Sequence, residues 1–228
     1  MRIATAAAAA VFVISTATGA LAQGTGITLM PPDQARWDIA VHAGRHGVKR
    51  SDIGDDWNRW YESGVVSASG GFYVTPHLKV EGDVSHAGEA SLYTQQSVVV
   101  PGQSWPYPRF RDHRLRATTA SGAAVWQFFE NQWFHPFAGA GVLVLHERER
   151  AEALAPQAVP VGPAGTLPFI MPALPALEAS RTAVQPFLTT GFKVYVSKQA
   201  FLRTDVRVGV SRDGVASAQW RAGIGIDF

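Results

Sequence analysis

Every second residue of the C-terminal stretch 215–228 is apolar. The apolar positions are Phe228, Ile226, Ile224, Ala222, Trp220, Ala218 and Ala216, and the positions between them are Asp227, Gly225, Gly223, Arg221, Gln219 and Ser217. A period of two predicts a β-strand with one apolar and one polar face. A soluble sheet also alternates in this way. The class of protein therefore depends on whether the apolar face looks inward to a core or outward to lipid.

Similar alternation predicts seven further strands. Their ranges are 37–48, 65–75, 78–87, 113–129, 133–147, 181–196 and 201–211. The last of these alternates most cleanly, because Leu202, Val206 and Val208 face away from Arg203 and Asp205. In 113–129 and 133–147 the alternation is poor, so the facing of these two strands stays open.

The connections between the predicted strands differ in length from one rim to the other. Short turns lie near Pro76, Asn131 and Lys198, and they alternate with the hairpin turn at 212–214 and with three long connections. These long connections are 49–64, 88–112 and 148–180. Short turns on one rim and long loops on the other are typical of transmembrane barrels. We therefore predict an all-β, eight-stranded antiparallel up-and-down transmembrane β-barrel. We expect 148–180 to be a mobile or self-packed loop, and 97–100 to extend the neighbouring strands.

Charged residues occupy the polar faces of several strands. The candidates for a charge network inside the barrel are Lys79, Glu81, Asp83, Lys193, Arg203, Asp205, Arg207 and Arg221. An eight-stranded barrel has an interior just wide enough for side chains. The mixed signs favour a paired network that satisfies a polar packed interior. A gated narrow ion path through the same network is the alternative.

Aromatic residues gather near the short turns and the chain end. They are Trp37, Phe72, Tyr73, Trp126, Phe128, Trp133, Phe134, Tyr195, Phe201 and Phe228. This grouping predicts an aromatic belt at one lipid boundary. A second set lies in the long connections: Trp57, Trp60, Tyr61, Trp105 and Tyr107, with Phe110 nearby. Exposed aromatics of this kind can anchor a partner, clamp a glycan or lipid headgroup, or rest on the upper rim of the barrel.

The N-terminus resembles an export signal. Residues 1–22 are mostly small and apolar and end in Ala20-Leu21-Ala22, which fits a cleavage site. An N-terminal membrane anchor is the less favoured alternative, because the run is short and rich in alanine. We predict a signal peptide at 1–22, an irregular leader at 23–36 and a barrel domain at 37–228. No later apolar run is long enough for a transmembrane helix.

Composition narrows the chemistry further. The chain of 228 residues has no cysteine, which excludes disulfides and thiolate metal sites. Its formal net charge of +2 makes the pI of 9.1 only a weak indication of anionic partners, so we predict no nucleic-acid binding.

Four short segments resemble a known superfamily. They are Gly225-Ile-Asp-Phe228, Tyr73-Val-Thr-Pro-His-Leu78, Pro136-Phe-Ala-Gly-Ala-Gly141 and Gly191-Phe-Lys-Val-Tyr-Val-Ser197. In order and spacing they are similar to the small eight-stranded outer-membrane β-barrels, such as the OmpA transmembrane domain and the opacity-type surface proteins. The resemblance implies insertion into the lipid of a bacterial outer membrane. It also implies that Phe228, Ile226 and Ile224 are an assembly signal read by the barrel-insertion machinery. No periplasmic domain of the OmpA type follows, so we expect no peptidoglycan-binding role.

No catalytic constellation stands out. None of the seven histidines is followed two residues later by serine, the pattern of eight-stranded lipid A deacylases. Ser85 and His86 are adjacent, so they should point to opposite faces of a strand. His42 and His46 lie about 13 Å apart along a strand, too far to share one metal. We therefore expect no enzyme activity and no catalytic, cofactor-binding or metal site.

The functional prediction is an integral outer-membrane barrel with a structural or surface-interaction role, present as a monomer. An extracellular partner would bind through the three long loops. The first alternative is a soluble secreted lipocalin-like barrel that carries a small apolar ligand. In that case Glu81, Asp205 and Arg207 would point outward, while Val208 and Ile226 would fill the centre. A lipid-modifying outer-membrane enzyme is a weaker alternative.

Overall fold

A computed structural model describes residues 36–50, 59–100, 106–129, 133–161, 168–212 and 214–228. The predicted signal peptide, the leader up to residue 35, Trp57 and Trp105 lie outside these ranges.

The described chain consists of strands. They are β1 (Trp37–Arg50), β2 (Arg59–Tyr73), β3 (Leu78–Val98), β4 (Tyr107–Gln127), β5 (Phe134–Ala151), β6 (Gln157–Val159), β7 (Phe169–Met171), β8 (Leu177–Tyr195), β9 (Ala200–Ser211) and β10 (Gly214–Asp227). Eight of them close a barrel in the order β1-β10-β9-β8-β5-β4-β3-β2, while β6 and β7 pair only with each other. The barrel neighbours are all antiparallel. The predicted all-β, eight-stranded antiparallel barrel is therefore confirmed.

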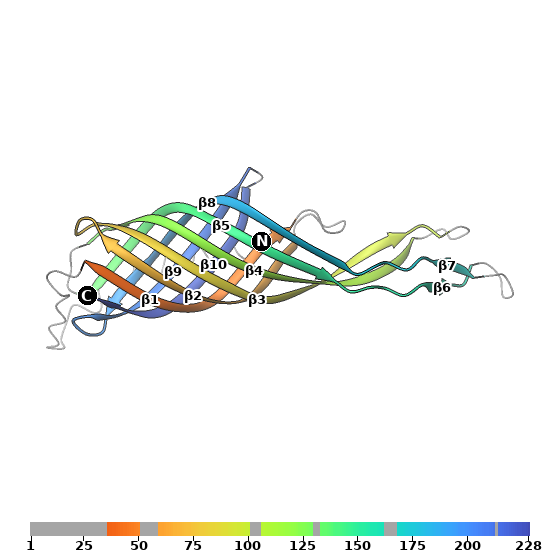
Figure 1. Ribbon diagram of the computed structural model, residues 1–228, viewed down its shortest axis with the longest axis horizontal. Coiled ribbons are helices and arrows are strands. Elements are labelled where there is room, and N and C mark those ends of the chain that lie inside the picture. Colours follow the sequence, from red (N-terminus) through yellow and green to blue (C-terminus); the bar gives the residue numbers. More distant parts are fainter. Residues whose placement is uncertain (1–35, 51–58, 101–105, 130–132, 162–167, 213) are drawn as a thin grey trace, which may run out of the picture.

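The two ends of the described barrel chain meet at one rim. The backbone amides of Arg36 and Trp37 donate to the carbonyl of Phe228 at 3.1 and 3.0 Å. The β2–β3, β4–β5 and β8–β9 connections lie at the same rim, and β6 and β7 lie far beyond the opposite one (Figure 1).

Four strands continue past the rest of the barrel. The β2–β3 pairing ends at Val65–Ala87, whereas β3 and β4 stay paired up to Val98–Tyr107. On the other side β8 leaves β9 at Phe187 but stays paired with β5 up to Leu177. We call the projecting parts of β3, β4, β5 and β8, together with the β6–β7 ribbon, the extension (Figure 1).

The extension corrects the predicted long loops. Residues 59–64, 88–98, 107–112, 148–151, 157–159, 169–171 and 177–180 are strand. The described parts of 148–180 form an antiparallel ribbon with a bridge between Leu154 and Leu174, rather than a mobile or self-packed loop. In these ranges apolar and polar residues no longer alternate regularly, since Tyr93 and Phe110 are exposed while Thr94 and Arg109 are buried. Predictions from alternation therefore ended β2, β3, β4, β5 and β8 too early on this side.

The structure also decides how β4 and β5 face. Leu115 and Val125 of β4, and Leu145 of β5, are buried in the lumen, while Trp126 and Val144 are exposed on the outer wall. Part of the lumen is itself apolar, so both faces of these strands carry apolar residues. Alternation alone could not separate the two faces for this reason.

Candidate functional site

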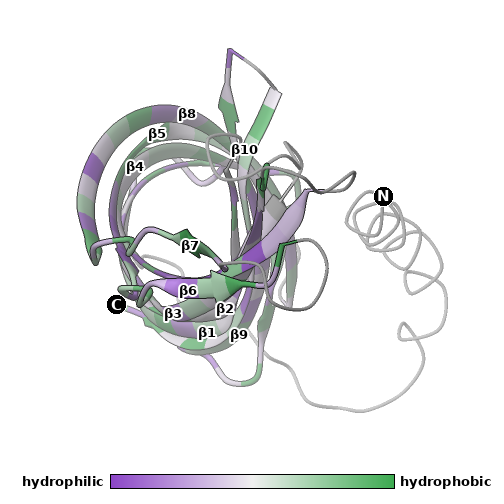
Figure 2. Cartoon of the chain, turned by 90° about the vertical axis from the view of Figure 1, so that its right-hand side faces the viewer, coloured by the Kyte–Doolittle hydropathy of each residue, from purple (hydrophilic) through white to green (hydrophobic). Residues whose placement is uncertain are grey.

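The outer wall of the barrel is apolar. Large side chains that stand exposed on it include Ile39, Val41, Val66, Val80, Val84, Val142, Leu188, Leu202, Trp220, Ile224 and Ile226. Ile224 is 61% exposed and Ile226 is 47% exposed, although both would be core residues in a soluble sheet. Figure 2 shows the closed ring from the end that carries β6 and β7, with hydrophilic and hydrophobic residues alternating along β8. None of the described segments is a helix long and apolar enough to cross a membrane.

Aromatic side chains form a ring around the rim with the short connections, but fewer than predicted. Trp37 and Phe72 pack at a ring separation of 4.7 Å, and Trp126, Phe128 and Phe228 are exposed. The prediction was wrong for three others, since Tyr195 and Phe201 are buried in the lumen and Tyr73 bonds an interior carboxylate. Tyr195 lies two residues from Lys193 on β8, and Phe201 lies two residues from Arg203 on β9. Residues two apart share a strand face, so the inward charges indicated that both rings also point into the lumen.

Ten charged side chains in the lumen form a cluster that we call the ionic plug. They are Asp38, Lys79, Glu81, Asp83, Lys193, Arg203, Asp205, Arg207, Arg221 and Asp227, none more than 5% exposed. All eight residues of the predicted charge network lie among them. Five are acidic and five are basic, so the plug as a whole is neutral.

The upper layer of the plug joins three arginines to three carboxylates. Arg203 contacts both oxygens of Glu81, at 2.5 and 2.9 Å. Arg221 contacts both oxygens of Asp205, at 2.9 and 3.0 Å. Two-point contacts of this kind match the planar guanidinium and are stronger than single hydrogen bonds. Each pair therefore has a defined geometry as well as a neutralised charge.

Three further bonds link these pairs across the lumen. Arg221 Nη1 reaches Asp83 at 2.6 Å, and Arg207 reaches Asp83 at 2.9 Å and Glu81 at 3.0 Å. Each carboxylate in this layer thus has at least two basic partners. The layer is a continuous network in which no single pair can be removed without affecting another.

The lower layer encloses Lys193. Its Nζ donates to Asp38 at 3.1 Å, to Asp227 at 3.0 Å and to the hydroxyl of Tyr73 at 2.7 Å. The ammonium also lies 3.7 Å from the ring centroid of Phe201, close enough for a cation–π contact. The Tyr195 hydroxyl donates to Asp227.

Lys79 joins the two layers of the plug. Its Nζ lies 2.8 Å from Asp38 in the lower layer and 2.7 Å from Glu81 in the upper layer. Prediction from the sequence missed Asp38 and Asp227. Their direction could have been predicted, because each is next to an outward apolar residue of its strand and must therefore point into the lumen.

Toward the opposite rim the lumen carries a cluster of apolar side chains, beside buried polar ones such as His46, Glu147 and Gln185. This cluster includes Val48, Tyr61, Val65, Ala87, Ala90, Leu115, Ala117, Leu143, Leu145 and Phe187. Phe137 and Phe187 connect it to the plug, since the guanidinium carbons of Arg203 and Arg207 lie 4.6 and 5.4 Å from their ring centroids. The rings of Phe137 and Phe187 therefore join the apolar cluster to the arginines of the plug.

Two arginines of β4 hold the extension together. Arg109 donates to the carbonyls of Pro172 and Ala155 at 2.6 and 2.9 Å, and Arg111 donates to those of Pro175 and Glu152 at 2.5 and 3.0 Å. These four bonds bridge the β3–β4 hairpin to both arms of the β5–β8 ribbon. These bonds take the place of a regular ladder beyond residue 112.

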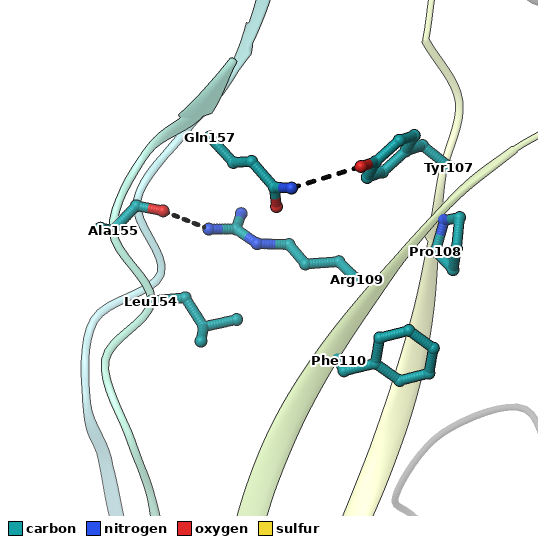
Figure 3. Close-up of a pocket in the computed structure, with 7 residues that line it drawn as sticks. All are labelled: Tyr107, Pro108, Arg109, Phe110, Leu154, Ala155 and Gln157. Carbon is teal, nitrogen blue, oxygen red and sulfur yellow. Dashed lines mark hydrogen bonds between the residues drawn. The ribbon is translucent and has the colours of Figure 1, made fainter. Parts of the chain in front are cut away.

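An open pocket of about 390 Å³ lies where the β4 tip faces the start of the ribbon (Figure 3). Tyr107, Phe110 and Leu154 give it an apolar surface, and Gln157 donates to the Tyr107 hydroxyl at 3.3 Å. Arg109, whose side chain is drawn reaching Ala155, closes one side.

The structure separates the predicted loop aromatics. Tyr107 lies at the pocket, whereas Trp60 belongs to β2 and packs its ring beside Gly47. The prediction of Tyr61 as a loop aromatic is wrong, since this residue is only 2% exposed and belongs to the apolar cluster inside the barrel. As neighbours on a strand, Trp60 and Tyr61 must face opposite sides of the sheet.

The candidate enzyme residues do not converge. Ser85 bonds Thr119 in the lumen, whereas His86 bonds Thr118 on the outer wall, so the two side chains lie on opposite faces. His42 and His46 are both buried in the lumen. No group of three or more potential metal ligands occurs within the described ranges.

Comparison with known proteins identified similar structures but no similar sequence. No protein family and no curated protein matches the chain. The N-terminal β-barrel domain of OprF from Pseudomonas aeruginosa aligns with a TM-score of 0.48 at 10% identity, covering 86% of this chain and 100% of that one. Ail, the attachment invasion locus protein of Yersinia pestis, aligns at 0.47 and 12%, covering 86% and 99%. The outer membrane protein OprG of Pseudomonas aeruginosa aligns at 0.45 and 10%, covering 86% and 97%.

The architecture follows from the chain's own geometry. Eight antiparallel strands close on themselves, the charged residues are paired in the lumen, and the exposed wall is apolar. This is the arrangement of a barrel whose surroundings are lipid and whose centre is polar. The chain has the fold of the small eight-stranded outer-membrane β-barrels, to which the motifs of its sequence are similar.

Proposed function

We propose that the protein is an integral barrel of a bacterial outer membrane, exported through a signal peptide at 1–22. Its role is structural or surface-interacting, with a closed lumen and an extension that faces the cell exterior. The observation that carries this proposal is the contrast between the two sides of the wall. Ile224 is 61% exposed on the outer wall. Arg221, three residues earlier on the same strand β10, is 0% exposed and lies in the lumen.

The same contrast argues against a soluble carrier of lipocalin type. Such a carrier keeps its apolar residues inside, where the ligand binds, and its charged residues in water. Here Asp205 and Arg207 are buried, while Ile226 is exposed. In water this barrel would expose a continuous apolar wall, which soluble monomers rarely do.

The ionic plug supports a lumen that does not conduct. All ten charges of the plug have partners of opposite sign within the lumen. Moving an ion through this region would require breaking buried pairs, each of which costs several kcal/mol when one partner is lost. The ion path therefore ranks below structural satisfaction of the polar interior.

The chain's C-terminal end supports assembly as a membrane barrel. Phe228, Ile226 and Ile224 all face outward, and the Phe228 carbonyl accepts the two amides that close the barrel. We infer that the barrel-insertion machinery reads this end and that outer-membrane lipid surrounds the monomer afterwards. The extension, with its pocket at Tyr107, is the part available to an extracellular partner.

Membrane fractionation with a heat-dependent gel-mobility shift tests the proposal. The wild-type chain should be found in the outer membrane and migrate differently before and after boiling. Ile224→Asp or Val206→Asp should block assembly, because each introduces a charge into the lipid-facing wall. The matched control is Ser91→Asp, a change of the same charge on an exposed residue of the extension, which should assemble normally.

Two results would contradict the proposal. Recovery of the wild-type chain in the soluble periplasmic fraction would remove the membrane assignment. Normal assembly of Ile224→Asp, or equal failure of Ser91→Asp, would show that the apolar wall does not face hydrocarbon.

A further inference from the structure

The apolar wall ends in a straight row across four strands. Val84, Ala120, Val144 and Val184 lie directly opposite one another on β3, β4, β5 and β8. All four face outward, and Val84 and Val184 are 59% and 69% exposed. Because this row is apolar across all four strands, it marks the upper limit of the hydrocarbon on this side of the barrel.

The next outward row toward the extension is polar. It consists of His86, Thr118, His146 and Thr182, again directly opposite one another. His86 Nδ1 and Thr118 Oγ1 lie 3.1 Å apart, and His146 Nδ1 and Thr182 Oγ1 lie 2.9 Å apart. Where the threonine hydroxyl donates to Nδ1, the Nε2–H of the ring remains a donor toward the surroundings.

Two rows of arginine follow on β4 and β5. Arg116 lies opposite Arg148, and one row further out Arg114 lies opposite Arg150. Like charges directly opposite each other on an antiparallel pair are destabilising. The β4–β5 ladder therefore carries four cations on one face, an arrangement that needs anions nearby.

The carboxylates of the extension neutralise most of this face, but unevenly. Glu89 lies 2.9 Å from Arg116 and 3.5 Å from Arg114. Arg114 also contacts Asp112 and Glu152, and the hydrogen bond that Arg114 donates to the Asp112 carboxylate raises the pKa of Arg114. Glu178 lies 3.2 Å from Arg150. All but one of the four arginines thus have an acidic partner.

Arg148 is the exception. Within the described ranges it has no ion pair, and its cross-strand neighbours are Arg116 and Ser180. Its neighbours two residues away along the strand are His146 and Arg150. Arg148 and Arg116 therefore form a focus of positive charge with only Glu89 beside it, about 7 Å along the strands from the polar row.

We propose that Arg116 and Arg148, with His86 and His146 below them, bind a phosphate group in the headgroup of an outer-leaflet lipid. The inference rests on the proposed function, because it needs the apolar wall to lie in a membrane. The height of the site favours a lipid as the source of the anion. Phosphates of a leaflet lie just above its hydrocarbon, and the arginine row lies two rows above the last apolar one. The guanidinium fork suits a phosphate in two-point contact.

The opposite wall offers a matched control. Arg45 of β1 is exposed and faces outward above Ala43, and its cross-strand neighbours are Trp220 and Gly64. It is therefore a single outward-facing cation without a second arginine opposite it. General attraction to an anionic leaflet would depend on Arg45 as much as on Arg148, whereas a built site would not.

The experiment measures lipid retention by the full-length mature barrel. Wild-type protein and three variants are placed in phosphatidylcholine nanodiscs that contain either bisphosphorylated lipid A or its dephosphorylated form, and bound lipid is counted by native mass spectrometry. The variants are Arg148→Gln, the double change Arg116→Gln with Arg148→Gln, and Arg45→Gln. The heat-dependent mobility shift is recorded for each, so that a folding failure is separated from a binding loss.

We expect the wild-type barrel to retain the phosphorylated lipid in preference to the dephosphorylated form. The double change should weaken retention about tenfold, the effect of losing roughly one charge-assisted hydrogen bond. Arg148→Gln alone should weaken lipid retention by less than the double change. Its mobility shift should be normal, because Arg148 has no ion pair to break within the described ranges. Arg45→Gln should change retention less than about twofold.

Three outcomes would overturn the inference while leaving the membrane barrel intact. Equal loss with Arg45→Gln would indicate attraction by net charge only. Equal retention of bisphosphorylated and dephosphorylated lipid A would show that the site does not recognise a phosphate group. Displacement of the lipid by inorganic phosphate would show that a free anion, not a lipid headgroup, is the ligand. Absence of the mobility shift in the wild type would instead count against the proposed function itself.

Discussion

Removing Arg221 is the most direct perturbation of the ionic plug. Its guanidinium is fully buried and makes bonds to Asp205 at 2.9 and 3.0 Å, to Asp83 at 2.6 Å and to the Ser67 hydroxyl at 2.8 Å. Arg221→Met keeps much of the volume and removes all four bonds. The plug then holds five carboxylates against four cations, so a negative charge remains uncompensated in the lumen.

The size of the effect follows from what the carboxylates retain. Asp205 still has Arg203 at 3.1 Å, and Asp83 still has Arg207 at 2.9 Å, so neither is fully unpaired. Breaking a buried pair by removing one partner costs about 3–5 kcal/mol. At about 1.4 kcal/mol per factor of ten, the folding equilibrium constant should fall roughly a hundredfold to several thousandfold.

Urea unfolding of the barrel in phosphatidylcholine vesicles, followed by tryptophan fluorescence, measures the loss. Arg150→Met is the matched control, because Arg150 and Glu178 are both 72% exposed in their ion pair and such pairs contribute about 0–1 kcal/mol. The double change Asp205→Asn with Arg221→Met restores neutrality and should recover part of the stability. A loss for Arg221→Met no larger than that for Arg150→Met would refute the coupled network. A large gain in single-channel conductance at unchanged stability, for Arg221→Met or for Arg207→Ala, would favour the ion path instead.

Two further predictions concern close packing and the extension. Gly191→Ala should destabilise the barrel by about 1–3 kcal/mol, because the added Cβ would collide with the Thr204 carbonyl, whereas a Cβ at Gly122 meets nothing within 4 Å and should be neutral; equal unfolding midpoints would contradict this. Arg109→Ala should raise amide hydrogen exchange in the β6–β7 ribbon about tenfold or more, since two charge-assisted bonds to carbonyls are lost, without changing the heat-dependent mobility shift. Equal exchange in the ribbon before and after the change would show that other contacts hold it.

Within the lipid-spanning part, the pattern of the sequence was enough to predict most of the fold. A strand between hydrocarbon and a polar lumen must alternate, so the faces of β9 and β10 could be assigned residue by residue. The same parity identified the eight charged residues that the structure brings together in the plug. Asp38 and Asp227 follow the same rule, although the predicted network did not include them.

Only the tertiary structure decided which charges meet. Arg203 and Glu81 are 122 positions apart in the chain, and Arg221 and Asp83 are 138 apart, so their contact depends on the closed strand order and its register. The extension was also beyond prediction, because its strands lack the regular apolar alternation that marks the strands of the barrel wall. The sequence by itself determined which face of each membrane strand is apolar, since solvent acts on every second residue separately. Partners across the lumen, and the arginine rows above the lipid, depend on how distant strands align, which no local pattern contains.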